Sequence, residues 1–195
     1  MSSFIDELMK NYGSEMVSHV SQNLGLSSKT VEQIIPNIVP VILGGLKKQK
    51  DAHGGIEGVE NIMKNFGTPD ILNNLSDLFR EKAKEENPDP TLNGLLGNSG
   101  LTAAKAISKK FNIDESIAKK LIPMVAPVIF GALMKKKDED GLGANGLIAL
   151  LDRDGDGSIL DDVAGFFFNN SGSPQKGKSG NLIGGLIGSI FGKKR

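Results

Sequence analysis

The residues in this chain best suited to chemistry form a short acidic run at 152–162. Three carboxylates alternate with other residues, a glycine follows the third, and Ile159 comes two positions later. Ca²⁺ prefers six to eight oxygen ligands, and alternating carboxylates on a tight turn converge on one point. Glycine permits such a turn because it lacks a restricting side chain. The run therefore predicts a site for a divalent cation, with Ca²⁺ as the expected ion, formed by Asp152, Asp154, Asp156, Ser158, Asp161 and Asp162.

The run also departs from the EF-hand calcium loop, which carries a bidentate Glu at its twelfth position. Here that position is Val163, so Asp161 or Asp162 would have to close the ligand shell early, as in shortened calcium loops. The departure predicts a weaker site, a site of altered shape, or none. A structural interpretation stays open beside it, because Ser158 with Asp161 also fits a capping box at a helix start.

The rest of the sequence shows no catalytic constellation. There is no Cys, which excludes thiol catalysis, a disulfide framework and Cys-based metal sites. The two histidines, His19 and His53, have no obvious nucleophile beside them, and we expect His19 to be a surface or partly buried side chain. Glycine-rich segments follow predicted helices instead of strands, so they are poor phosphate-binding loops. We therefore expect a non-enzymatic protein without catalytic residues or an organic cofactor.

An internal repeat organises the elements around the acidic run. Residues 30–46, TVEQIIPNIVPVILGGL, recur 87 positions later as IAKKLIPMVAPVIFGAL at 117–133. The match extends roughly from 13–79 to 100–168, and one inserted residue changes the offset to 88 in its later part. A fixed offset marks a repeated structural unit. Apolar residues recur at helical spacing in both copies, so we expect an all-α chain with two tandem copies of a small multi-helix module.

The repeat and the local composition together predict the domain boundaries. We expect a first helical repeat at 1–80 and a charged, then glycine-rich linker at 81–99. A second helical repeat, which carries the acidic run, follows at 100–168, and a flexible linker with a basic amphipathic tail occupies 169–195. Small modules bury a smaller fraction of their surface, which favours a core shared by both copies.

Local signals predict where the first helices begin and end. Apolar spacing predicts a helix at 2–11 that ends near Gly13, and a second helix at 14–24 that Gly25 ends. Ser27 or Ser28 is suited to cap the next helix, as Asp114 is in the second copy. Pro36 and Pro40, both repeated in the second copy, predict a short helix to about Ile35 and then either a kink or a new helix with Pro36 near its first turn, because proline lacks an N–H and clashes with the preceding turn.

The remainder of each copy carries further helix signals. Gly44-Gly45 are expected to allow close packing or to help end the helix. Another helix is predicted at 54–66, and Thr68-Pro69-Asp70 marks the start of the next. Lysines follow the proline-containing segment in both copies and suit a helix C-terminus better than a phosphate site: Lys47, Lys48, Lys50, Lys135, Lys136 and Lys137.

The tail combines positive charge with an apolar periodicity. The last 25 residues contain no acid, and apolar side chains recur every three to four positions within 181–195, interrupted by glycines. This pattern predicts a short, weak amphipathic helix. Three interpretations stay open: docking on the body or on a second subunit, contact with an anionic membrane surface, or a disordered tail.

Composition limits the location and the class of partner. A formal net charge of +0 does not indicate a nucleic-acid partner. The N-terminal segment MSSFIDELMKNYG lacks the basic start and apolar run of a signal peptide. No run of about 20 apolar residues predicts a transmembrane helix. The absence of Cys fits a reducing compartment, so we expect a cytoplasmic protein.

Three segments together resemble a bacterial family of unknown function, the YidB-like domain. They are the doubled I-P-x-x-x-P-V-I-x-G segment, the glycine-rich join NGLLG at 93–97 and the run DGDGSILDD at 154–162. The resemblance covers most of both copies. It implies an all-helical, homeodomain-like arrangement and a bacterial source, and it brings no activity and no site residues with it.

These observations lead us to expect an interaction or scaffold protein that binds a protein partner or self-associates. A DNA-associated protein is the alternative that the homeodomain-like resemblance keeps open, although a recognition helix usually clusters Arg and Lys. Arg occurs here only at Arg80, Arg153 and Arg195. A further alternative is a peripheral membrane-surface protein that binds through 181–195.

Overall fold

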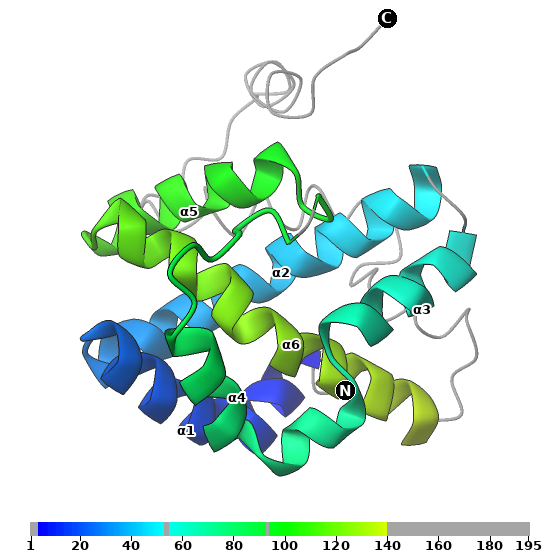
Figure 1. Ribbon diagram of the computed structural model, residues 1–195, viewed down its shortest axis with the longest axis horizontal. Coiled ribbons are helices and arrows are strands. Elements are labelled where there is room, and N and C mark those ends of the chain that lie inside the picture. The colour runs from blue at the N-terminus through cyan, green and yellow to red at the C-terminus, as the bar shows by residue number, and fades with distance from the viewer. Residues whose placement is uncertain (1–3, 53–54, 93, 140–195) are drawn as a thin grey trace, which may run out of the picture.

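The computed structural model describes residues 4–52, 55–92 and 94–139, and every regular element within them is a helix (Figure 1). In chain order these are α1 Phe4–Leu24, α2 Ser28–Ala52, α3 Gly55–Phe66, the 3₁₀ helix η1 Pro69–Asn73, α4 Leu75–Ala83, α5 Asn98–Phe111 and α6 Glu115–Glu139. The prediction of an all-α chain is confirmed for these residues. The second-copy counterparts of α3, η1 and α4 would fall within 140–168, outside the described residues. Two complete tandem modules, and the domain boundaries, therefore stay predictions.

What does recur among the described residues is a helical hairpin. The helices α2 and α6 each span 25 residues and begin at 28 and 115, the same offset of 87 that the sequence shows. The helices before them end in a left-handed residue, Gly25 with φ 66° and Asn112 with φ 50°. The next N–H then bonds back to the equivalent serine carbonyl, from Leu26 to Ser21 and from Ile113 to Ser108, at 3.1 Å in both cases. This is the Schellman pattern of helix ends.

The helix starts after these turns are capped as the sequence predicts. The hydroxyl of Ser27 accepts the backbone N–H of Thr30 at 3.1 Å, and a carboxylate oxygen of Asp114 accepts that of Ser116 at 2.7 Å. Hydrogen bonds from Ser116 hold the pKa of Asp114 below its ordinary value, which keeps the cap charged. Capping by Ser27 and Asp114 is thus confirmed.

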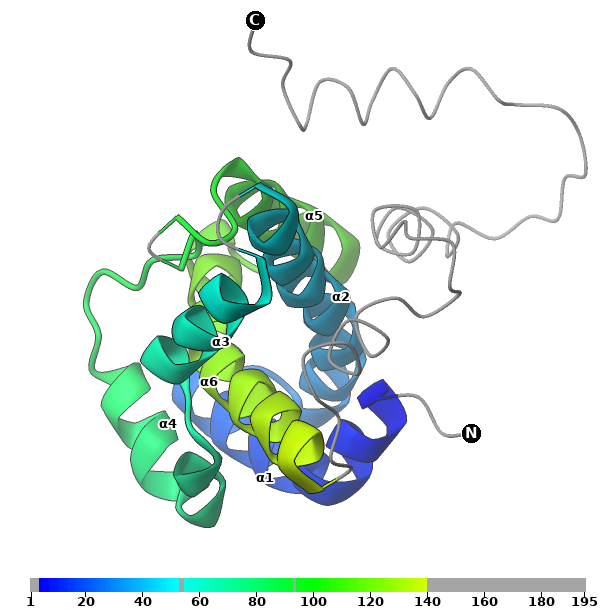
Figure 2. The same ribbon diagram turned by 90° about the vertical axis from the view of Figure 1, so that its right-hand side faces the viewer.

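The two hairpins pack reciprocally around one hydrophobic core. The first hairpin's α1 contacts its own α2 and the partner helix α6, and α5 contacts its own α6 and the partner helix α2. Figure 1 shows α6 running through the middle of the body, with α5 on one side and α1 and α4 on the other. Figure 2 shows the same body turned, with α2 beside α5 and α3 beside α6. The described parts of both copies therefore share a core, and their apolar side chains form one cluster.

A new helix does not begin at the prolines, so that alternative is wrong: α2 and α6 continue through Pro36 and Pro40 and through Pro123 and Pro127. A proline inside a helix costs about 3 kcal/mol. Each fully buried aliphatic side chain contributes about 1.5–3 kcal/mol. The helix α2 buries nine aliphatic side chains, seven of them completely, so burial outweighs two prolines. They are Val31, Ile34, Ile35, Ile38, Val39, Val41, Ile42, Leu43 and Leu46.

Two predicted glycine boundaries are also wrong. The helix α1 runs without interruption through Gly13, since one interior glycine costs only about 1 kcal/mol and Leu8 and Met16 are buried on either side of it. Similarly, α2 continues past Gly44 and Gly45 to Ala52. The side chain of Leu96 lies where a Cβ of Gly45 would stand. Close packing, the other expected role of these glycines, is therefore the one observed at Gly45.

The second half of the first copy follows the prediction closely. The helix expected at 54–66 is α3, and Thr68 with Pro69 begins η1. The next helix, α4, starts separately and is capped by Asn74, whose side chain accepts the N–H of Asp77 at 3.3 Å. The single helix that the sequence suggests after Pro69 is therefore two short ones.

One described helix, α6, is long and apolar enough to cross a membrane by length and composition alone, with a mean hydropathy of 1.7 over its most apolar window. In the structure, 83% of that window is buried inside the fold. Since the core helix of a helical body meets the same criterion, α6 is accounted for by its packing against the other helices.

Candidate functional site

The six predicted calcium ligands, Asp152, Asp154, Asp156, Ser158, Asp161 and Asp162, lie outside the described residues, as do His53 and the tail at 181–195. The structure therefore neither brings the six together nor separates them. It does describe the turn that occupies the corresponding place in the first copy, between α3 and α4.

The first-copy turn is a helix-capping turn held against the core. Thr68 is extended and precedes η1, and Asn74 caps α4 through its side chain. At the offset of 88, Asn74 corresponds to Asp162, and Asp is an equally good cap.

A shallow groove lies between the start of α1 and the end of α6. Its volume is about 80 Å³, enough for little more than a few waters. Two helices from opposite ends of the described chain meet there. It is lined by Phe4, Glu7, Leu8, Asn11 and Tyr12 of α1 and by Ala132, Lys135, Lys136 and Glu139 of α6.

The polar side chains of this groove bind one another. Lys136 Nζ donates to a carboxylate oxygen of Glu7 at 2.6 Å. Lys135 Nζ donates to the hydroxyl of Tyr12 at 3.3 Å and lies 3.8 Å from Glu139. The hydrogen bond to Tyr12 raises the pKa of Lys135, because it favours the protonated amine. The groove thus fastens α1 to α6.

The third lysine of this run reaches a different helix. Lys137 Nζ donates to Glu60 of α3 at 2.6 Å, with both side chains about three-quarters buried. That hydrogen bond holds the pKa of Glu60 below its ordinary value of 4.5. All three lysines therefore bind groups of the protein, which supports the helix-end interpretation of this run over a phosphate site. Sequence spacing could not identify their partners, because Glu7 and Glu60 lie 129 and 77 residues away.

A buried amide in the core is a polar feature that sequence reasoning missed. Asn37 is 6% exposed; it donates to the Gln33 carbonyl at 2.7 Å and accepts from Lys110 of α5 at 2.9 Å. This contact joins the two hairpins. A signal was present, because the residue interrupts an apolar stripe and its counterpart in the second copy is Met124.

The histidine of α1 has a packing role. His19 stacks on Phe79 of α4, with ring centroids 5.5 Å apart and the planes 16° from parallel. Its side chain is half-buried, as expected. Within the residues that the structure describes, no three His, Asp or Glu side chains gather closely enough to hold a metal ion.

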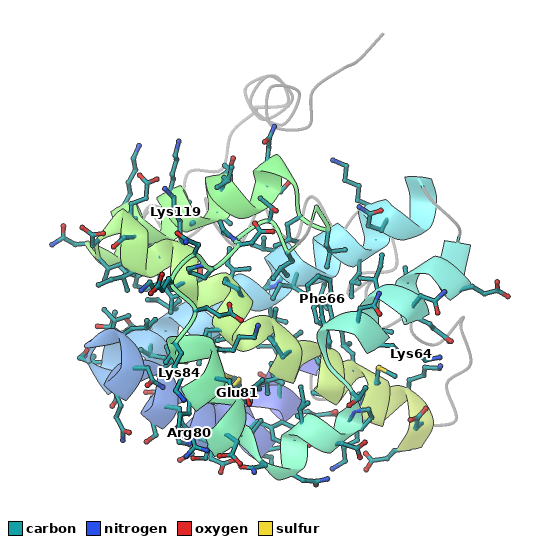
Figure 3. The ribbon with its side chains drawn as sticks, viewed as in Figure 1. Lys64, Phe66, Arg80, Glu81, Lys84 and Lys119 are labelled. Carbon is teal, nitrogen blue, oxygen red and sulfur yellow. The ribbon has the colours of Figure 1, made fainter. Side chains whose placement is uncertain are left out.

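Charged side chains are spread over the outside of the body. Figure 3 labels Lys64 of α3, Arg80 and Glu81 of α4, Lys84 at the end of α4, and Lys119 of α6; the first four are exposed and Lys119 is half-buried. By contrast, Phe66 packs inward against Phe130, with ring centroids 5.6 Å apart. Basic and acidic groups alternate on these helices, so this surface is mixed in sign.

Comparison with known proteins places the chain in a family. The model of a family described as "Bacterial protein of unknown function (DUF937)" matches residues 6–136 and again 132–195. The first match spans both helical hairpins. Searches of curated proteins and of solved structures found no match. The chain therefore belongs to this bacterial family of unknown function, which confirms the resemblance to the YidB-like domain.

Proposed function

We propose that this protein is a non-enzymatic, cytoplasmic interaction or scaffold protein whose second copy is stabilised by Ca²⁺ bound at 152–162. The observation that carries the proposal is the correspondence between the acidic run and the first-copy turn at 67–74. That turn joins two helices and presses on α6. An ion in the equivalent turn would have the same task, because it would fix the angle at which two helices follow each other.

The ligand chemistry of the run supports a cation. Three carboxylates at alternate positions of a short turn repel one another unless a cation or solvent compensates them. In the first copy the corresponding turn carries a single acid, Asp70, and needs no such compensation. The second copy therefore carries more negative charge at this place in the repeat than the first copy does.

The described groove has a structural role and gives no support to catalysis. Its lysines and acids bind one another at the ends of helices, and Lys135 is held protonated. Such pairs stabilise a helix contact without activating a nucleophile. The partner we propose is a protein, either a second copy of this chain or another protein.

Direct readout of DNA is less well supported than protein binding. In a helix-turn-helix protein the second helix of the hairpin lies in the major groove and needs an exposed face. Here those second helices are α2 and α6, and α6 is buried at every position from Leu121 to Leu133. A membrane surface is the remaining alternative, supported by the basic amphipathic pattern at 181–195.

The direct test is a calorimetric titration of Ca²⁺ into the full chain. We expect saturable heat at micromolar to millimolar Ca²⁺, the range of known calcium loops, and no such heat in a variant with Asp154→Ala and Asp156→Ala. Asp70→Ala is the matched control, because it removes the acid of the corresponding first-copy turn and should leave the titration unchanged. No heat from the parent protein up to millimolar Ca²⁺ would refute the calcium site.

A further inference from the structure

The first-copy segment that follows α3 packs on α6. Because α2 and α6 each contain two internal prolines, we call them the proline helices. A Cβ added to Gly67 would collide with the carbonyl oxygen of Pro127 in α6. From the other side, a Cβ on Gly131 would stand 3.0 Å from the Thr68 carbonyl oxygen and 3.2 Å from Ile71. The helix α6 contacts both η1 and α4. The strip of α6 formed by Pro123, Pro127 and Gly131 is consequently buried.

The same strip is present on α2 and is less covered. Pro36, Pro40 and Gly44 occupy the positions equivalent to Pro123, Pro127 and Gly131. Pro40 is buried as Pro127 is, but Pro36 and Gly44 at the two ends of the strip are half-buried, whereas their counterparts on α6 are buried. The described elements that pack on α2 are α1, α3, α5 and α6. Among these described elements, none packs on α2 in the way that η1 and α4 pack on α6.

The repeat identifies the residues that would cover this strip of α2. Packing between the hairpins is reciprocal, since α1 contacts α6 and α5 contacts α2. In this packing the first helix of each hairpin contacts the second helix of the other hairpin. If the segments that follow the hairpins are exchanged in the same way, the counterpart of η1 and α4 packs on α2. The apolar residues of η1 and α4 recur at an offset of 88: Ile71, Leu72, Leu75, Leu78 and Phe79 correspond to Ile159, Leu160, Val163, Phe166 and Phe167.

The helix face that would receive the segment is smaller than its first-copy counterpart. In the first copy Met16 of α1 is buried and His19 stacks on Phe79. The positions of α5 that correspond to them are Ala103 and Ala106. At 166 and 167, where the first copy has Leu78 and Phe79, the segment carries two phenylalanines that are suited to pack on these small residues.

We infer that residues 156–167 of the same chain dock on α2 and α5 as η1 and α4 dock on α6 and α1, with Ile159 against Gly44 and Phe167 beside Ala106. The occupant is thus an intramolecular segment, and the two proline helices become equivalent when it is in place. This docking rests on the repeat geometry and not on Ca²⁺.

Cysteine cross-linking tests the docking directly, because the natural chain contains no Cys. The test variant is Gly44→Cys with Ile159→Cys in the full chain, oxidised in buffer with EDTA. Gly131→Cys with Ile71→Cys is the matched positive control, since those positions are in contact in the structure. Gly44→Cys with Ile190→Cys measures random collision with the tail.

We expect the test pair to form an intrachain disulfide at a rate within about tenfold of the positive control and at least tenfold faster than the tail pair, because a docked pair has a high effective concentration. A rate no faster than the tail pair would overturn the inference, and so would a disulfide that forms only between chains.

A second pair covers the case in which cysteine at position 44 impairs folding. Ala106→Cys with Phe167→Cys is joined by a short bismaleimide, and His19→Cys with Phe79→Cys provides the positive control for the stacked pair. Intrachain linkage comparable to that control supports docking on α5. Linkage at the level of the tail pair contradicts it.

Discussion

Two serines at equivalent places in the repeat have different surroundings. The hydroxyl of Ser108 donates to the Ile113 carbonyl at 2.7 Å. Ser21, its counterpart, is 8% exposed, and its hydroxyl finds no hydrogen-bond partner within the described part of the chain. The repeat therefore provides a matched pair in which only one member makes a side-chain hydrogen bond.

We expect Ser108→Ala to lower the free energy of unfolding by about 1 kcal/mol, the net value of one hydrogen bond. Ser21→Ala should leave it unchanged or raise it by up to about 1 kcal/mol, because it removes a buried polar group without a partner. Urea denaturation of both variants measures the difference. Equal losses in the two variants would show that the Ser21 hydroxyl is bonded in solution.

Two glycines should respond to alanine in opposite directions. At Gly67 a Cβ would meet the backbone of Pro127, which cannot move without shifting α6. At Gly13 the nearest atom is the terminal methyl carbon of Met9, 3.2 Å away on a flexible side chain.

Gly67→Ala is expected to destabilise the protein by about 1–3 kcal/mol through overpacking. Gly13→Ala should stabilise it by about 0.5–1 kcal/mol, because alanine is the better residue inside a helix. Thermal unfolding of the two variants measures both changes in stability. A neutral Gly67→Ala would mean that η1 does not press on α6 as the structure shows.

At the scale of elements, charged pairs fasten the ends of helices that are far apart in sequence. The pair of Lys137 and Glu60 joins α6 to α3, and Lys136 and Glu7 join α6 to α1. The core beneath them is apolar and non-directional, so these contacts help to fix how the end of α6 lies against its neighbours.

The contact between Glu60 and Lys137 should depend on pH in a definite direction. The lowered pKa of Glu60 means that its contribution to stability is present above the ordinary value of 4.5 and is lost as the pH falls through the lowered value. Glu60→Gln should therefore cost roughly 0.5–1 kcal/mol at neutral pH and almost nothing near pH 2.

Denaturation across this pH range tests the effect, and Glu57→Gln is the control on the same helix. Glu57 is exposed in the first turn of α3. An equal cost of Glu60→Gln at neutral and acid pH would show that the carboxylate charge contributes nothing to the α3–α6 contact.

The proline helices show what local sequence rules can and cannot supply. Proline disfavours a helix at its own position, which predicts a kink or a new helix at Pro36. Continuity comes from burial by neighbours distant in the chain, and that burial cannot be read from a window of local residues. The caps at Ser27 and Asp114 were predictable, since a cap involves only the next few residues.

At the scale of the whole molecule, the sequence predicted the helical class, the repeated hairpin and the family. The packing of η1 and α4 on α6 could not be predicted, because periodicity shows which face of a helix is apolar but not which helix covers it. The groove between α1 and α6 was missed for the same reason. The acidic run at 152–162 is a different case, because alternating carboxylates are a local pattern from which cation binding can be predicted without knowledge of the fold.

The central claim is that Ca²⁺ bound at 152–162 stabilises the folded protein, and thermal melting tests it most directly. The full chain is melted with EDTA and with excess Ca²⁺, beside the variant with Asp154→Ala and Asp156→Ala. A ligand that binds only the folded state adds about 2.7 kcal/mol at a hundredfold excess over its Kd, roughly 5–10 °C for a chain of this size. We predict such a rise in the parent protein and its loss in the variant. The same melting temperature in EDTA and in Ca²⁺ for the parent protein would contradict the claim and leave the run as a helix cap.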